Sequence, residues 1–137
     1  MDNVNEKKKI LIVDDDEIQL SFAEIILNDE YKIVTAKSGK KALDHLYHGF
    51  VPDLILLDIL MPEMDGFEAY NRIRAISLLQ DIPIVFLTSV REETKMQEAL
   101  DIGAADYIMK PYNKENLLSR IKNVIKTFEY KKAKNPI

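Results

Sequence analysis

The sequence contains no cysteine, so disulfide bonds and thiol chemistry are excluded. That absence fits a cytoplasmic protein, because disulfide-bonded chains belong mostly to oxidising compartments. No apolar run approaches the ~18 residues that a membrane-spanning helix needs, and residues 1–9 lead into no signal-peptide-like stretch. Basic residues form no cluster of the kind that binds nucleic acid, and no glycine-rich phosphate loop is present. We therefore expect no membrane association and no direct nucleic-acid binding.

What remains is the composition of a folded, globular chain. Of its 137 residues, 47% are hydrophobic and 31% are charged, and the formal net charge is −4. This length suits one domain with one hydrophobic core. We assign residues 1–128 to that domain, and residues 129–137 to a C-terminal tail or the start of a linker.

Five short apolar runs alternate with five segments of helical periodicity. The runs predict β-strands at residues 10–13, 31–36, 54–58, 83–88 and 106–109. The helical periodicity falls in residues 17–28, 42–47, 67–73, 96–100 and 117–128. This (βα)5 alternation predicts a doubly wound α/β fold with a five-stranded parallel sheet. The first, third and fourth runs are the most apolar and belong in the centre, which favours the flavodoxin-like strand order 2-1-3-4-5.

The first predicted helix has four large apolar residues at helical spacing. They are Ile18, Phe22, Ile25 and Ile26. Because residues three and four positions apart share one side of a helix, we expect these four to form its apolar face.

Polar, chemically active side chains follow four of the five predicted strands. They are Asp14, Asp15 and Asp16 after the first strand, Asp58 after the third, Thr88 and Ser89 at the end of the fourth, and Lys110 after the fifth. The carboxyl ends of parallel strands meet at one edge of the sheet, so these side chains are expected in one cleft. Each has an ordinary explanation by itself, and Asp16 in particular is suited to cap the first helix. Their coincidence at four strand ends favours a functional site.

This set holds the parts for phosphoryl transfer to an aspartate. Clustered carboxylates repel one another unless a hard divalent cation such as Mg²⁺ neutralises them. A metal and a lysine offset charge on phosphoryl oxygens, and a hydroxyl donates a hydrogen bond to them. The two histidines, His45 and His48, fall on the second predicted helix and are expected to be exposed. A hydrolase triad and a zinc site therefore both lack their parts.

Four segments carry a family resemblance. They read ILIVDDD, DLILLDILMPEMDG, PIVFLTS and GAADYIMKPY. In this order and at this spacing they resemble the receiver domain of response regulators in two-component signalling, over about residues 9–128. The resemblance implies that Asp58 is the phospho-acceptor and that Thr88 and Lys110 contact the phosphoryl group. It also implies a switch in which Thr88 moves inward and the Tyr107 ring turns into the space behind it.

The resemblance extends to a metal and to partners. It implies Mg²⁺, with Mn²⁺ able to substitute, held by the carboxylates of Asp14, Asp15 and Asp58 and by the backbone carbonyl of Leu60. It implies a phosphoryl donor that is a sensor histidine kinase or a histidine phosphotransfer protein, and a downstream target or fused output domain. No independent enzyme is expected beyond the chain's own phosphorylation and slow dephosphorylation.

The resemblance to the family also covers the loop after the fifth predicted strand and the face through which some members dimerise. The Lys110–Pro111 peptide bond corresponds to the position that is usually cis. Asp106 and Arg120 match charged residues through which some members dimerise, whereas Ala105 and Asn116 replace others, so a homodimer is left open.

Three positions near the site depart from the family's common choices. Ser89 adds a hydroxyl where a small apolar residue is usual, and Leu60 and Val90 are apolar where other members carry polar side chains that orient a hydrolytic water. These two apolar side chains have two explanations of equal weight. Either they make the phosphorylated state long-lived, or they only pack against a partner or the adjoining loop and do not affect its lifetime.

Two other functions remain as alternatives. A phosphohydrolase of the haloacid-dehalogenase type would use Asp14 and Asp16, but Ile18 stands where threonine or valine is usual and no acidic pair follows Lys110. A phosphorylation-independent interaction module would leave the acidic and lysine residues without a chemical role.

Overall fold

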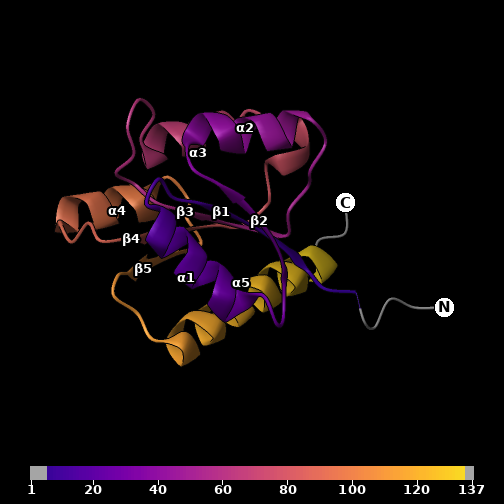
Figure 1. Cartoon of the computed structure of the whole chain (residues 1–137). Helices are drawn as coiled ribbons and strands as arrows, with labels where there is room; N and C mark the ends of the chain where they lie inside the picture. The colour runs from indigo at the N-terminus through magenta and orange to yellow at the C-terminus, as the bar shows by residue number, and fades with distance from the viewer. Residues whose placement is uncertain (1–5, 135–137) are drawn as a thin grey trace.

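Five parallel strands run through the middle of the computed structural model, which describes residues 6–134 (Figure 1). The strands are β1 (Lys9–Val13), β2 (Lys32–Ala36), β3 (Leu54–Leu57), β4 (Ile84–Thr88) and β5 (Asp106–Met109). Their order in the sheet is β2-β1-β3-β4-β5, and each neighbouring pair is parallel. The predicted fold class and strand order are therefore confirmed.

The helices alternate with the strands as predicted. They are α1 (Glu17–Leu27), α2 (Gly39–Tyr47), α3 (Gly66–Arg74), α4 (Glu93–Asp101) and α5 (Lys114–Lys134), with a short 3₁₀ helix, η1 (Ser77–Leu79), before β4. None of the helices within residues 6–134 is both long enough and apolar enough to cross a membrane. The last helix continues past Phe128, so residues 129–134 are helical, and there the carboxylate of Glu129 pairs with the ammonium of Lys8 at 2.6 Å.

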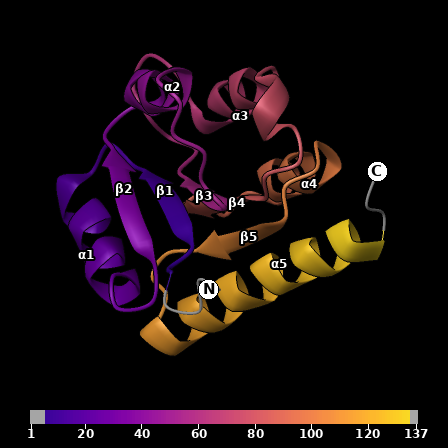
Figure 2. The same cartoon turned by 90° about the vertical axis from the view of Figure 1, so that its right-hand side faces the viewer.

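Successive side chains of the central strands point to opposite faces of the sheet, and each face has its own helical cover. On β1, Leu11 and Val13 belong to the core beneath α2, α3 and α4. Ile10 and Ile12 belong to the core beneath α1 and α5. Figure 2 shows these two layers on either side of the sheet. Burial on both faces explains why the strand sequences are continuous apolar runs rather than alternating ones.

The exposed and buried sides of α1 differ from the prediction. Of the four residues expected to form its apolar face, Ile26 is buried, whereas Ile18 and Ile25 are 78% and 75% exposed. Phe22 is also 48% exposed. The helix is buried instead through Leu20, Ala23, Ile26 and Leu27. The prediction was wrong because α1 has apolar residues on two sides, and helical spacing alone cannot tell which side meets the sheet.

Gly66, the first residue of α3, fixes the loop that follows β3. Its amide donates to the carbonyl of Ile59 at 2.7 Å. A Cβ atom at this position would lie 2.2 Å from the carbonyl oxygen of Asp58 and 2.8 Å from the Cα atom of Ile59. Only glycine therefore lets the start of α3 approach the backbone of Asp58 this closely.

Gly39, the first residue of α2, provides a matched comparison for a test of this packing. A Cβ atom at Gly39 would meet the Sδ atom of Met64 at 2.6 Å, but that atom ends a flexible side chain. We predict that Gly66→Ala lowers the free energy of unfolding by about 1–3 kcal/mol, because backbone cannot move aside, and that Gly39→Ala costs clearly less. Urea denaturation of both variants measures the difference. Equal costs would contradict the packing argument.

Candidate functional site

The first strand delivers one buried and two exposed carboxylates. The amide of Asp14 donates to the carbonyl of Ala36 at 3.1 Å, so the strand pairing reaches this residue, and Asp14 is only 4% exposed. Asp15 is exposed. The side chain of Asp16 accepts from the amides of Ile18 and Gln19 at 3.0 and 3.2 Å, which confirms its predicted role as the cap of α1. Asp14 and Asp15 are therefore left for another role.

The third strand delivers Asp58 beside this acidic pair. Its amide donates to the carbonyl of Val13 at 3.0 Å, and the residue is 8% exposed. One carboxylate oxygen accepts from the amide of Ile59 at 2.7 Å. One carboxylate oxygen from each of Asp14, Asp15 and Asp58 lies within 4.8 Å of the others. The strand order thus brings Asp58 beside two adjacent acids that lie far from it in the sequence.

The fifth strand delivers the ammonium of Lys110 into the same group. Its Nζ atom lies 2.5 Å from Oδ2 of Asp14 and 3.4 Å from Oδ2 of Asp58. The lysine side chain is 11% exposed, and its backbone amide donates to the carbonyl of Thr88 at 2.9 Å. The peptide bond between Lys110 and Pro111 is cis.

The charges in this group act on the ionisation of Asp14. Burial raises the pKa of the Asp14 carboxyl above its ordinary value of 3.8, because the charged form loses water. The hydrogen bond and charge of Lys110 lower the pKa, and the neighbouring Asp58 carboxylate raises it. For Asp14, the effect of burial therefore outweighs the opposing effect of Lys110.

The fourth strand delivers Thr88, which is fully buried. Its hydroxyl oxygen accepts from the amide of Val90 at 3.3 Å. The carbonyl of Val90 in turn accepts from the hydroxyl of Tyr107 at 2.7 Å. The Tyr107 ring is 7% exposed and packs 6.3 Å from the ring of Phe86, so it already lies in the inward position that we expected it to reach by switching.

The other positions discussed from the sequence differ in their exposure. Leu60 is 65% exposed in the loop after Asp58, and the assignment of its carbonyl as a metal ligand stays a prediction. Ser89 is exposed and Val90 is buried. His45 and His48 are exposed on α2, as predicted.

Sequence reasoning missed one residue beside the site, Arg91. One guanidinium nitrogen donates to the backbone carbonyl of Lys110 at 2.9 Å, and another lies 3.8 Å from the sulfur of Met109. Arg91 stands in the connection between β4 and α4, in no recognisable motif. A side chain that binds a backbone carbonyl leaves no trace in residue types, so no signal in the sequence points to this contact.

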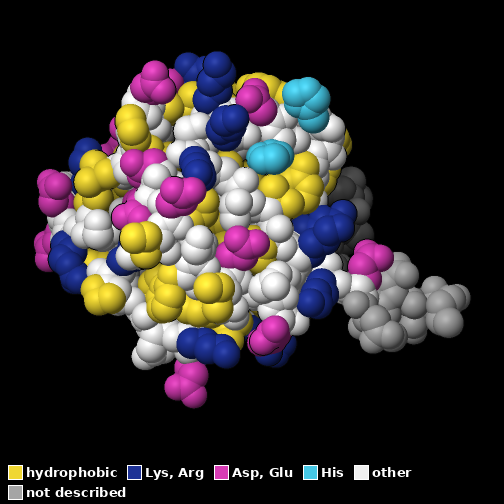
Figure 3. Space-filling model, in the orientation of Figure 1, with side chains coloured by type: hydrophobic (Ala, Val, Ile, Leu, Met, Phe, Trp, Pro, Cys, Tyr) yellow, Lys and Arg dark blue, Asp and Glu magenta, His cyan; other side chains and the backbone are white. Residues whose placement is uncertain are grey.

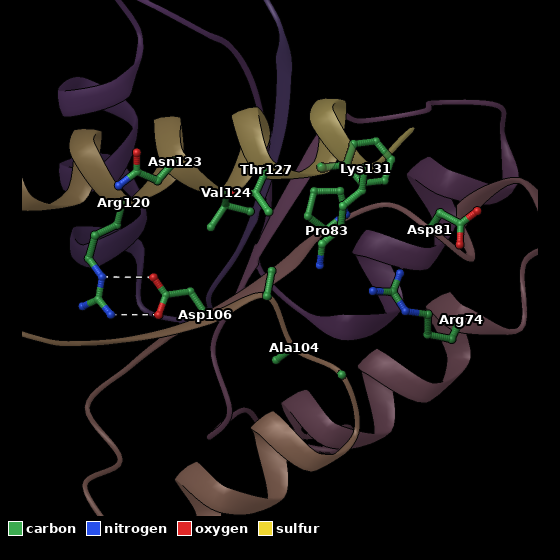
Figure 4. Close-up of a pocket in the computed structure, with 13 residues that line it drawn as sticks. Arg74, Asp81, Pro83, Ala104, Asp106, Arg120, Asn123, Val124, Thr127 and Lys131 are labelled. Carbon is green, nitrogen blue, oxygen red and sulfur yellow. Dashed lines mark hydrogen bonds and ion pairs between the residues drawn. The ribbon is translucent and has the colours of Figure 1, made fainter. Parts of the chain in front are cut away.

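A pocket of about 650 Å³ lies at the opposite edge of the sheet, where β4 and β5 begin and α5 passes over them (Figure 4). Both arginines that line it, and Asp106, are engaged within the protein. Arg120 forms two hydrogen bonds with Asp106 at 2.8 and 3.0 Å, and Arg74 donates to the carbonyls of Leu79 and Ile82. The two residues that match the family's dimerisation set thus pair with each other inside one chain, so we do not base a function on this pocket.

Comparisons with known proteins assign the family. The family model of the response regulator receiver domain matches residues 10–122. The chain is 35% identical over 119 residues to the chemotaxis protein CheY of Halobacterium salinarum, covering 86% of this chain and 97% of that protein. The structure resembles chemotaxis protein CheY4 of Vibrio cholerae with a TM-score of 0.82 and 33% identity, covering 87% of this chain and 99% of that one. The chain belongs to the response regulator receiver family, which confirms the resemblance.

Other curated relatives are longer proteins. The chain is 39% identical over 127 residues to the probable transcriptional regulator ycf27 of Galdieria sulphuraria, covering 92% of this chain and 48% of that protein. It is also 39% identical to 9% of the length of histidine kinase P4 of Formosa agariphila. The chain spans about half the length of the ycf27 relatives that it matches. Receiver domains of this kind therefore occur joined to other segments.

The ionisation of Asp14 gives a direct test of the site's electrostatics. We predict that its carboxyl titrates above 3.8, and that Lys110→Met raises the pKa further, because the lysine is what lowers it. Between pH 3.8 and the folded-state pKa the native protein binds more protons than the unfolded chain, so this group's contribution to stability falls as pH rises through that interval. Carboxyl ¹³C NMR of metal-free protein measures both values. A lower pKa in Lys110→Met would contradict the assignment.

Proposed function

We propose that this receiver takes a phosphoryl group onto Asp58 from a phosphohistidine of a sensor histidine kinase or a histidine phosphotransfer protein. A carboxylate oxygen of Asp58 attacks phosphorus, the bond between phosphorus and the donor nitrogen breaks, and the donor imidazole leaves. The observation that carries the proposal is the burial of Asp58 at a strand end with the Lys110 ammonium 3.4 Å away and two further acids beside it.

The acidic group fits a divalent metal. Oxygen atoms of Asp14, Asp15 and Asp58 lie within 4.8 Å of one another, and carboxylate oxygens are the ligands that Mg²⁺ prefers. Burial raises the pKa of Asp14, and the neighbouring Asp58 carboxylate raises it further, so a bound cation would favour the ionised form of this group. When bound, Mg²⁺ or Mn²⁺ would neutralise phosphoryl oxygens during transfer. Asp14, Asp15 and Asp58 would hold it, with the Leu60 carbonyl as a further ligand.

The chain's own residues divide the remaining work. Lys110 places a positive charge against Asp58, where phosphoryl oxygens would lie, and so lowers the repulsion between two anions. The hydroxyl oxygen of Thr88 accepts from the amide of Val90. The hydroxyl proton can therefore be donated to a phosphoryl oxygen. The inward Tyr107 ring links the same loop to the β5 surface through the carbonyl of Val90. Engagement of Thr88 by the phosphoryl group would favour this inward position of Tyr107 over an outward one, and that two-state population shift would carry the signal to a downstream target or output domain.

Two other functions would leave these contacts unexplained. The receiver family assignment favours a phospho-acceptor over a phosphohydrolase of the haloacid-dehalogenase type. A module that acts without phosphorylation gives no reason for buried acids and a buried lysine, which cost free energy to remove from water. Incubation with Mg²⁺ and acetyl phosphate separates the three functions, because they give a stable covalent adduct, catalytic release of phosphate, or no reaction.

Substitution of the acceptor tests the proposal. We predict that Asp58→Asn folds normally and forms no detectable adduct with Mg²⁺ and acetyl phosphate, because the neutral amide is a poor nucleophile. Intact-protein mass spectrometry measures the adduct, and circular dichroism checks the fold. Asp65→Asn removes a carboxylate from the same loop, where it caps α3, and should still be labelled. Labelling of Asp58→Asn at the wild-type rate would show that another residue is the acceptor.

A protein donor needs a surface beside Asp58 on which to dock, and α1 offers one. Ile18, Phe22 and Ile25 stand at spacings of four and three residues and are 78%, 48% and 75% exposed. Hydrophobic side chains gather on this face of the molecule over α1 (Figure 3). Helix α1 begins directly after the acidic residues, so this stripe borders the site. An apolar helical face presented by the donor is the partner that it suits.

Removal of this stripe should separate protein donors from small ones. We predict that the double variant Ile18→Ser, Ile25→Ser slows transfer from a phosphorylated histidine phosphotransfer protein by at least about tenfold. Each isoleucine that the docked donor covers would contribute about 1.5–3 kcal/mol to binding. Labelling by acetyl phosphate should not change, because a small donor needs no docking surface. Leu78→Ser, at a residue that is 79% exposed away from α1, is the control. Equal slowing with both donors would argue against docking on α1.

A further inference from the structure

Arg91 and Lys110 connect two neighbouring loops at the functional edge of the sheet. Arg91 lies between β4 and α4, and Lys110 is the first residue after β5. A guanidinium nitrogen of Arg91 donates to the carbonyl oxygen of Lys110 at 2.9 Å. A hydrogen bond from a charged donor is stronger than one between neutral groups. A side chain from the loop after β4 therefore holds the backbone of the loop after β5.

The backbone of Lys110 is bound on both sides by the same segment. Its amide donates to the carbonyl of Thr88 at 2.9 Å, and its carbonyl accepts from Arg91 three residues later. Pro111 follows and has no amide hydrogen of its own to donate. The two loops are thus joined at Lys110 by one contact from the strand and one from Arg91.

The ammonium of Lys110 depends on this anchoring. Lysine carries its charge on a flexible four-carbon stem, so the position of the charge is defined only as well as the backbone from which it extends. In this site the charge must reach Oδ2 of Asp14 at 2.5 Å and Oδ2 of Asp58 at 3.4 Å from a side chain that is 11% exposed. A displacement of the backbone changes which rotamers of the stem can reach both carboxylates, and so weakens the contacts.

We propose that Arg91 is a positioning residue that acts through Lys110. Its guanidinium holds the lysine backbone so that the ammonium stays between Asp14 and Asp58, and it ties that ammonium to the loop that carries Thr88. The inference deepens the proposed function, on which it rests for the catalytic value of Lys110. Arg91 itself is exposed, and its guanidinium hydrogen bonds go to the Lys110 carbonyl and the Met109 sulfur rather than to a carboxylate, so it is not assigned a catalytic role.

The reactivity of the Lys110 amine tests the positioning directly, without metal and without phosphorylation. An amine-acylating reagent reacts slowly with a buried, ion-paired lysine. In Arg91→Ala we expect acylation of Lys110 to rise roughly threefold to tenfold, the change that follows loss of one charge-assisted hydrogen bond. Lys37, whose side chain is 59% exposed and paired with Glu17, serves as the internal reference. Arg72→Ala, which removes an exposed arginine paired with Glu68, is the matched control.

Two results of the acylation experiment would overturn the inference. One is an unchanged rate at Lys110 in Arg91→Ala. The other is a parallel rise at Lys110 and Lys37, which would report general loosening of the fold. A rise at Lys110 alone, absent from Arg72→Ala, supports the positioning role.

Titration with Mg²⁺ gives a second measurement that a purely structural role would not move. The ammonium of Lys110 occupies the carboxylate oxygens that a divalent cation would use, so loosening it should tighten Mg²⁺ binding in Arg91→Ala while Asp58 labelling slows. In a Lys110→Ala background, Arg91→Ala should have no further effect on the Mg²⁺ dissociation constant. The same change in both backgrounds would indicate a long-range effect of charge and overturn the inference.

Absence of wild-type labelling would refute the proposed function, whereas the acylation result would still decide the role of Arg91.

Discussion

The close approach of one ammonium to two buried carboxylates is the contact on which the site at this edge of the sheet depends. Removing Asp14 and Asp58 from water costs several kcal/mol per ion, and only a close counter-charge offsets that cost. Lys110 supplies it, at 2.5 Å from one carboxylate and 3.4 Å from the other. Because these residues follow β1, β3 and β5, the contact spans three separate strands. Moving β1, β3 or β5 to another place in the sheet would therefore separate the charges that make the site.

Four of the acids near this edge of the sheet fall into two structural groups. Asp16 and Asp65 cap α1 and α3, with their carboxylates bound to backbone amides of the first helical turn. Asp14 and Asp58 make no such helix cap and lie buried against the strand ends. Gly66 lets α3 begin in contact with the backbone of Asp58, so the cap at Asp65 and the carboxylate at Asp58 are fixed by one short loop. The helix caps at Asp16 and Asp65 thus fix the backbone next to the buried carboxylates of Asp14 and Asp58.

Most of the fold and the central site could be predicted from the sequence, because both depend on strong local patterns. Continuous apolar runs identify β1, β3 and β4 as central strands, and acids at their ends then fall on one edge. The buried face of α1 could not be predicted, because Ile18 and Ile25 compete with Leu20 and Ala23 for the sheet and only tertiary packing decides. The contact of Arg91 with the Lys110 carbonyl could not be predicted either, because any residue offers a backbone carbonyl.

The loop after β4 is the point at which the charge of the site and the outer surface meet. Val90 binds Thr88 through its amide and Tyr107 through its carbonyl, and Arg91 binds the carbonyl of Lys110. A hydrogen bond is lost over a displacement of about 1 Å, so the loop cannot drift gradually while keeping all three contacts. It must either keep this arrangement or exchange several contacts together. A ligand shifts such an equilibrium only by its different affinity for the two states, and a phosphoryl group that engages Thr88 and Lys110 at once would have that difference.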